Sequence, residues 1–267
     1  MAEVLSRAYR QFAPPRRHTR QHRLHRGRRK LDTSASVKAR AAEVPQPIDW
    51  RDRIAISPPK NQGTCNACTS FALAGTIEAC LLIASPGQPS VPISAGFIHT
   101  CIGHADDTDP DTICSVGCDM YMTLAALQTN AYARETVIAY PFPSAACAAA
   151  ERLAPLAGFT EVDDPPSAKS SLVNAPIAAD LYIWSDFFSY TTNHAPAYVP
   201  DATTDGPYLH SVCVVGFDVT GWIIKNSMGT AWGDGNGFAT IPYGLCGMIG
   251  SKAPGNRSPR VGYALSV

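Results

Sequence analysis

The sequence has no apolar run long enough to cross a lipid bilayer. The longest candidate, from Phe71 to Ala84, is interrupted by Thr76 and Glu78, so we interpret it as a buried helix. The N-terminal segment is too polar to contain the hydrophobic stretch of a secretory signal peptide. We also find no internal repeat. These absences argue against a membrane protein and a repeat architecture, and they favour a globular chain.

Charge is also scarce, since 16% of the residues are charged and the formal net charge is zero. That zero conceals a split, because residues 1–44 contain 12 Lys and Arg against three acids, and the rest of the chain is acidic. We interpret residues 1–44 as a basic arm or short propeptide that docks on its own acidic domain. An ordinary solvated tail is the simplest alternative. The arm lacks interleaved aromatic residues, so we expect neither nucleic acid nor a membrane as partner.

Cysteine, in contrast, is abundant, with nine in 267 residues. This number favours disulfide bonds plus at least one unpaired thiol, as in secreted or extracytoplasmic proteins. Because no signal peptide is visible, the export route stays open.

Helical and strand patterns occupy different parts of the chain from residue 45 onward. The sequence predicts helices over 66–84 and 120–130. After Pro176, the runs "PIAADLYIW", "SVCVVGFD", "GWIIKN" and "GFATIP" predict strands separated by turns. Helices followed by strands indicate an α+β fold with two halves around a shared cleft.

The stretch "KNQGTCNAC" places Cys65 and Cys68 three residues apart at the start of the predicted helix. A thioredoxin-like redox pair would need a preceding strand, and none is predicted. A zinc site is an alternative, and its candidate ligands are Cys65, Cys68, Cys114, Cys118, His99, Cys101 and His104. A third interpretation is that one cysteine is structural and the other reactive.

The third interpretation accounts for more residues. Cys68 lies in the first helical turn, where the helix dipole favours a thiolate. His210 stands at the head of a predicted strand and could act as its base, and Asn226, which ends the next strand, could orient the imidazole. The Gln62 amide could join the Cys68 backbone N–H in holding an oxyanion.

With these residues in place, the chain resembles the papain family of cysteine peptidases. The matching segments, in family order, are "PIDWRD", "KNQGTCNAC", "AYPF", "LHSVCVVGF" and "WIIKNSMGTAWGDGNGF". The resemblance implies a peptidase domain over 45–267, with a mainly helical half at about 60–155 and a β-barrel-like half at about 156–267. It also implies a zymogen, a monomer, protein or peptide substrates, and no metal or organic cofactor.

By this resemblance, Cys68 is the nucleophile, His210 the general base and acid, Asn226 the orienting residue and Gln62 the oxyanion donor. The family pattern also implies two disulfides, Cys65–Cys118 and Cys101–Cys147.

The chain departs from the family at several positions. Thr69 and Met228 stand where the family has tryptophan, and Asp119, Met120 and Tyr121 follow Cys118 where it has Gly-Gly. Asn66, just before the site, is a candidate N-cap of the helix. We interpret the chain as a divergent, bacterial branch with a short N-terminal segment. These departures keep open a catalytically silent papain-like binding or inhibitory module.

Substrate contacts are predicted by position in the family pattern. Tyr208, Leu209 and Asp180 are expected to line a largely apolar pocket with an acidic wall, although Asp180 could instead face solvent. Trp232, the family's second aromatic, and Tyr121 complete the predicted substrate-binding set.

Overall fold

The computed structural model describes residues 45–54, 56–107, 109–135, 144–193 and 195–267. The basic arm over 1–44 and the "AYPF" segment lie outside these residues. Among the described helices, none combines the length and the apolar composition that a bilayer crossing requires.

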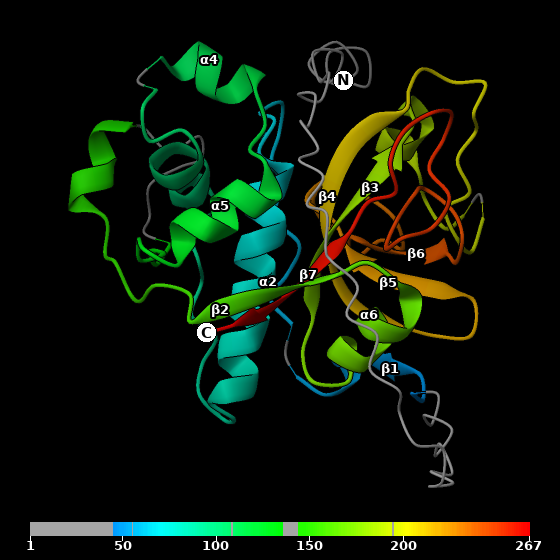
Figure 1. The fold of residues 1–267 in the computed structure, drawn as a ribbon, viewed down its shortest axis with the longest axis horizontal. Coiled ribbons are helices and arrows are strands. Elements are labelled where there is room, and N and C mark those ends of the chain that lie inside the picture. Colours follow the sequence, from blue (N-terminus) through cyan, green and yellow to red (C-terminus); the bar gives the residue numbers. More distant parts are fainter. Residues whose placement is uncertain (1–44, 55, 108, 136–143, 194) are drawn as a thin grey trace, which may run out of the picture.

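The first half of the chain is mainly helical. Its longest element is α2 (Cys68–Ala84), followed by α3 (Ala95–Phe97), the π-helical turn η2 (Ile98–Gly103), α4 (Pro110–Ser115), α5 (Met120–Leu127) and the 3-10 helix η3 (Ser144–Ala149). Most side chains of α2 are buried, because the helix lies between the other helices and the sheet (Figure 1). The predicted helices are therefore present, although the second ends three residues early.

The other half of the molecule is an antiparallel sheet, and all of its strands except β1 follow the helical segment in the chain. Its strands are β1 (Ile48–Asp49), β2 (Gly158–Val162), β3 (Ile177–Ile183), β4 (Tyr208–Phe217), β5 (Gly221–Lys225), β6 (Phe238–Pro242) and β7 (Gly262–Ser266). The order is β2-β7-β3-β4-β5-β6, with β1 paired to β4. No described pairing joins β2 to β6, so the expected barrel-like half is an open sheet.

Shorter elements cover the ends of this sheet. They are the 3-10 helices η1 (Trp50–Asp52) and η4 (Ser185–Ser189) and the helix α6 (Pro165–Leu172). The Asp164 carboxylate caps α6 by accepting a hydrogen bond from the Ser167 backbone N–H at 2.8 Å. The Trp50 indole N–H donates to the Leu172 carbonyl at 2.8 Å, which fastens η1 to the end of α6.

The two largest hydrophobic cores among the described residues lie in different halves of the molecule. One lies in the helical half and reaches the sheet at Ala178 and Tyr263; the other fills the sheet half around Trp222 and Phe187. Gly75 shows that α2 lies directly on β4, because a Cβ added there would be 3.7 Å from the Cβ of Cys213, an ordinary van der Waals contact.

Candidate active site

Cys68 is the first residue of α2 and is 7% exposed. The N-cap is Ala67, which has no side-chain acceptor, so the expectation that Asn66 caps the helix is wrong. Asn66 instead donates its amide N–H to the Ser115 carbonyl at 2.7 Å, which holds the loop before the helix. Negative charge on the Cys68 sulfur is favoured by the backbone N–H groups and dipole of the helix start.

His210 and Asn226 are brought together by neighbouring strands. His210 lies on β4, Asn226 directly follows β5, and the two strands pair antiparallel. The His210 Nε2 lies 2.8 Å from the Asn226 Oδ1. A carboxamide oxygen only accepts, so Nε2 carries the proton and Nδ1 is the basic nitrogen.

The first turn of α2 is tied to β4 next to the candidate residues. The hydroxyl of Thr69, which follows Cys68, lies 3.1 Å from that of Ser211, which follows His210. The Thr69 hydroxyl also donates to the Cys118 carbonyl at 2.9 Å. A threonine at this position therefore makes polar contacts across the two halves.

The His210 ring is fully buried against aromatic side chains. Its centroid lies 5.5 Å from that of Phe187, which packs at 4.8 Å from Trp232. Burial lowers the pKa of His210 to about 4, although the hydrogen bond to Asn226 opposes this effect. The imidazole is therefore neutral at pH 7 unless a thiolate stabilises its protonated form.

Gln62 is held beside the Cys65–Cys68 loop by hydrogen bonds of its backbone and its side chain. Its backbone N–H donates to the Ser227 carbonyl at 2.8 Å, and its side-chain oxygen accepts from the Ser227 hydroxyl at 2.5 Å. Its amide nitrogen donates to the Cys65 carbonyl at 2.9 Å. These contacts fix the carboxamide before any substrate arrives.

The candidate substrate residues have different environments. Tyr208 and Trp232 are buried, and the Trp232 indole donates to the Phe187 carbonyl at 2.6 Å. Leu209 packs partly buried beside Tyr182 and Trp184, and Tyr121 is 50% exposed. Substrate contact by these residues stays a prediction, and only Leu209 and Tyr121 offer partly or largely exposed side chains.

Asp180 is 5% exposed and does not face solvent. Its carboxylate accepts a hydrogen bond from the Ser211 hydroxyl at 2.7 Å and forms a 2.9 Å ion pair with Arg260. Burial raises the pKa of Asp180, whereas Arg260 opposes that rise. Any acidic wall therefore includes a matching cation. Sequence reasoning missed Arg260 because no local motif connects it to a residue 80 positions away.

Of the two predicted disulfide pairings, one is wrong and the other is present. Cys65 pairs with Cys114 rather than Cys118, whereas the second bridge joins Cys101 to Cys147, as the resemblance implied. The Asn66 backbone N–H donates to the Cys114 carbonyl at 3.0 Å, which brings the Cα atoms of Cys65 and Cys114 to 4.4 Å. Position along the chain could not distinguish two cysteines four residues apart. Cys118 is left as a thiol.

The helix α2, which begins at Cys68, packs against an antiparallel sheet whose strand β4 contains His210, and this is a papain-like α+β arrangement (Figure 1). Solved relatives share this fold. The proform of the ragweed pollen cysteine protease Amb a 11 aligns with a TM-score of 0.63 and 20% identity, over 86% of this chain and 67% of that one. Procathepsin L2 from Tenebrio molitor aligns with a TM-score of 0.62 and 21% identity, over 85% and 70%.

The model of the papain family cysteine proteases matches residues 44–253, and the chain belongs to this family. It is 30% identical to cysteine proteinase B of Leishmania mexicana over 91% of this chain and 52% of that protein. It is 26% identical to human cathepsin O, over 82% and 68%. The chain thus spans about half the length of the Leishmania relative. These relatives are eukaryotic, so the expected bacterial branch is not borne out.

Proposed function

We propose that this chain hydrolyses peptide bonds through Cys68, His210 and Asn226. The observation that carries the proposal is the 2.8 Å contact between His210 Nε2 and Asn226 Oδ1, because it assigns the basic lone pair of His210 to Nδ1. The family membership and the placement of Cys68 at a helix start support the same assignment.

The reaction would proceed through an acyl-enzyme. His210 Nδ1 takes the proton from the Cys68 thiol, and the sulfur attacks the carbonyl carbon of the scissile bond. The backbone N–H of Cys68 and the Gln62 amide hold the oxyanion, and its collapse expels the amine, which takes the proton from His210. His210 then deprotonates a water molecule, which attacks the thioester and releases the acid.

The direct test uses a dipeptidyl fluorogenic amide under mild reducing conditions. Hydrolysis by the wild-type chain and its loss in Cys68→Ala would support the proposal, as would a thiol-reactive epoxide that labels Cys68 stoichiometrically but fails in His210→Ala. A folded wild-type chain with neither hydrolysis nor labelling would favour the silent binding or inhibitory module, for which the substitutions at Thr69 and Met228 argue.

The substrate and the regulation of this site follow as further parts of the proposal. Peptides or proteins would bind beside Leu209 and Tyr121, and a positional peptide library would show whether Asp180 and Arg260 impose a preference. Residues 1–44 would cover the cleft as a propeptide; two solved relatives are themselves proforms. Deleting residues 1–44 should then raise the rate and remove its dependence on salt. The two bridges fit an oxidising, extracytoplasmic compartment.

A further inference from the structure

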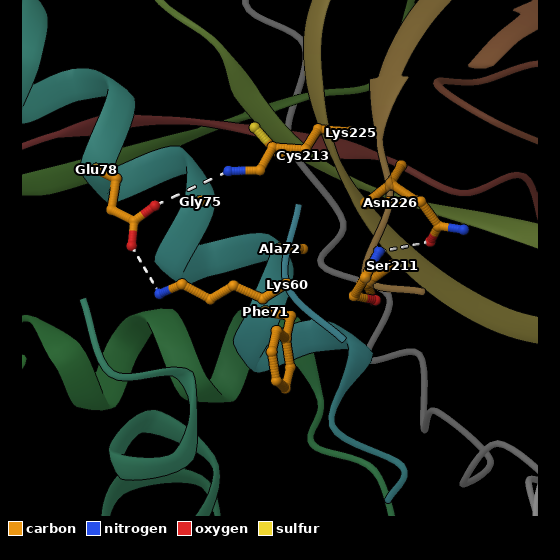
Figure 2. Close-up of a pocket in the computed structure, with 11 residues that line it drawn as sticks. Lys60, Phe71, Ala72, Gly75, Glu78, Ser211, Cys213, Lys225 and Asn226 are labelled. Carbon is orange, nitrogen blue, oxygen red and sulfur yellow. Dashed lines mark hydrogen bonds and ion pairs between the residues drawn. The ribbon is translucent and has the colours of Figure 1, made fainter. Parts of the chain in front are cut away.

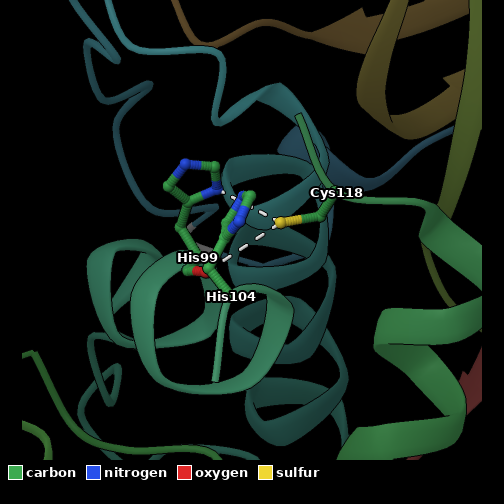
Figure 3. Close-up of side chains that lie close together, drawn as sticks. All are labelled: His99, His104 and Cys118. Atoms are coloured by element: carbon green, nitrogen blue, oxygen red, sulfur yellow. Dashed lines mark hydrogen bonds between the residues drawn. The ribbon is translucent and has the colours of Figure 1, made fainter. Parts of the chain in front are cut away.

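A second cluster of reactive side chains lies in the helical half, outside the proposed peptidase residues. His99 belongs to η2, His104 ends it, and Cys118 precedes α5; Figure 3 shows the three side chains close together. Their potential ligand atoms all lie within 4.8 Å of one another. The Cys118 Sγ is 3.3 Å from the His99 Nδ1, and the two imidazole centroids are 4.7 Å apart.

Backbone carbonyls fix the tautomers of both imidazoles. The His99 Nε2 lies 2.8 Å from the Ile113 carbonyl oxygen, and the His104 Nε2 lies 3.1 Å from that of Val116. Since a carbonyl oxygen can only accept, each Nε2 carries a proton and each Nδ1 carries a lone pair. Metal-binding histidines show the same arrangement, with the other ring nitrogen held by a carbonyl or carboxylate. The residues that orient the rings lie in and just after α4.

The burial of the cluster suits metal binding as well. His99 is 1% exposed, whereas His104 and Cys118 are partly exposed, so an ion can enter from the surface.

We propose that His99, His104 and Cys118 form a zinc site with water as the fourth ligand. One thiolate and two imidazoles are donors that zinc prefers. Ideal tetrahedral zinc separates its sulfur and nitrogen ligands by about 3.5 Å, close to the Cys118–His99 distance. On binding, the Cys118 thiol gives its proton to solvent and its sulfur donates an electron pair to the metal; nothing is oxidised. In the sequence, these residues are candidates only within a larger set of possible zinc ligands, and the family resemblance implied no metal.

The site would stiffen the border of the peptidase cleft. The Cys118 carbonyl accepts the hydrogen bond from Thr69, the residue after Cys68. Zinc on the Cys118 sulfur therefore fixes the loop that contacts the start of α2. A disulfide between Cys118 and Cys65 would remove the ligand, so the state of the Cys118 thiol is part of the test.

The experiment uses the full chain carrying Cys68→Ala, which removes the thiol proposed as the nucleophile. Alkylation and peptide mapping of the unfolded protein should find Cys118 reduced. Cobalt(II) titration should then show one equivalent bound, with a thiolate-to-cobalt band in the near ultraviolet, and zinc should displace it. Adding Cys118→Ala should abolish the band, and adding His99→Ala or His104→Ala should weaken cobalt binding at least about tenfold. Adding Cys80→Ala, which removes a buried free thiol on α2, should leave binding unchanged.

Three results would overturn the assignment. They are Cys118 found in a disulfide, no cobalt bound to the folded protein, or a near-ultraviolet band that survives Cys118→Ala. Should His99→Ala unfold the chain, the partly exposed His104→Gln supplies the same comparison. If the Cys118 thiol only donates a hydrogen bond to the His99 imidazole, no metal should bind.

Discussion

Two sets of polar contacts made by α2 can be compared. In one, the helix residue is a neutral threonine, and in the other it is a glutamate that forms ion pairs. At the first turn, Thr69 meets Ser211, and the charged pair of Asp180 and Arg260 lies further along the same chain of hydrogen bonds. Nine residues later along the helix, Glu78 is 1% exposed and forms ion pairs with two lysines. The end of α2 that contains Cys68 is thus bordered by hydroxyl groups, whereas Glu78 further along the helix is bordered by charged side chains.

The ionic bridge gathers segments from both halves. Lys60 lies 2.9 Å from Glu78 and Lys225 lies 3.9 Å from it, as Figure 2 shows. Ser57 donates a hydrogen bond to Glu78 and accepts one from Lys225 at 2.8 Å. Such a buried group requires all its partners, because a charge left unpaired in the interior is costly. We expect the ionic bridge (Ser57, Lys60, Glu78 and Lys225) to support the stability of the fold. We expect the hydroxyl bridge (Thr69, Ser211, Asp180 and Arg260) to support the geometry of the candidate site.

Breaking the ionic bridge should have the largest effect. Glu78→Gln leaves Lys225 buried without a counter-charge, and we expect a loss of about 3–5 kcal/mol in the free energy of unfolding. Urea denaturation measures it. The control is Glu151→Gln, which breaks the exposed pair with Arg134 and should cost about 1 kcal/mol or less. Equal losses in the two variants would contradict the role given to burial.

The pH dependence of stability tests whether His210 is uncharged in the folded protein. Because the pKa of His210 is lowered to about 4 from an ordinary value of 6.5, the unfolded chain binds more protons than the folded one between those values. Stability should therefore fall as pH drops through this window, with His210 contributing about 3 kcal/mol of the loss at pH 4.

The measurement is the urea midpoint from pH 4 to 7 for the wild type and His210→Gln. The difference between the two proteins isolates His210 from other histidines that titrate in the same range. A resting thiolate–imidazolium pair would raise the pKa of His210 and reverse the sign of this difference, so the experiment also decides the charge state of the site.

Removing the carboxylate of the hydroxyl bridge should have an intermediate effect. Asp180→Asn leaves the partly exposed Arg260 unpaired, and we expect a cost of about 1–3 kcal/mol in unfolding free energy. Combining it with Arg260→Met should recover part of that cost. A double variant no more stable than the sum of the single losses would show that the two side chains are not coupled.

The smallest loss of stability is expected on removing the contact between Thr69 and Ser211, the residues that follow Cys68 and His210. Thr69→Val and Ser211→Ala should each cost about 1 kcal/mol, with a coupling of at least about 0.5 kcal/mol in a double-mutant cycle. Because this contact borders the site, kcat should fall several-fold in Thr69→Val while KM changes little. An unchanged kcat would limit Thr69 to a structural role.

The local patterns predicted much of the fold. The unbroken apolar run after Cys68 indicated α2, and β-branched runs indicated β3, β4, β5 and β6, because these elements are buried on most sides. The same reasoning missed β2 and β7, whose short sequences "GFTEV" and "GYALS" are polar or partly exposed. Pairing with neighbouring strands holds them rather than their own composition, since β2 pairs with β7 and β7 also pairs with β3.

The candidate site also contains features that the sequence predicted and features that it did not. His210 and Asn226 were identifiable because each ends or begins a strand within a recognisable segment, and the sheet then sets their 2.8 Å contact. The disulfide partner of Cys65 could not be identified from the sequence, because Cys114 and Cys118 are only four residues apart and their positions alone do not distinguish them. In the folded chain, a backbone hydrogen bond from Asn66 N–H to the Cys114 carbonyl accompanies the Cys65–Cys114 pairing.

The sequence by itself determined the family, the order of helices and strands, and the residues proposed for chemistry. Only the tertiary structure decided that Arg260 neutralises Asp180, that two lysines surround Glu78, and that His99, His104 and Cys118 share one place. The reason is physical: periodicity and motifs report interactions between near neighbours, whereas buried charges and thiols find their partners through packing of segments far apart in the chain.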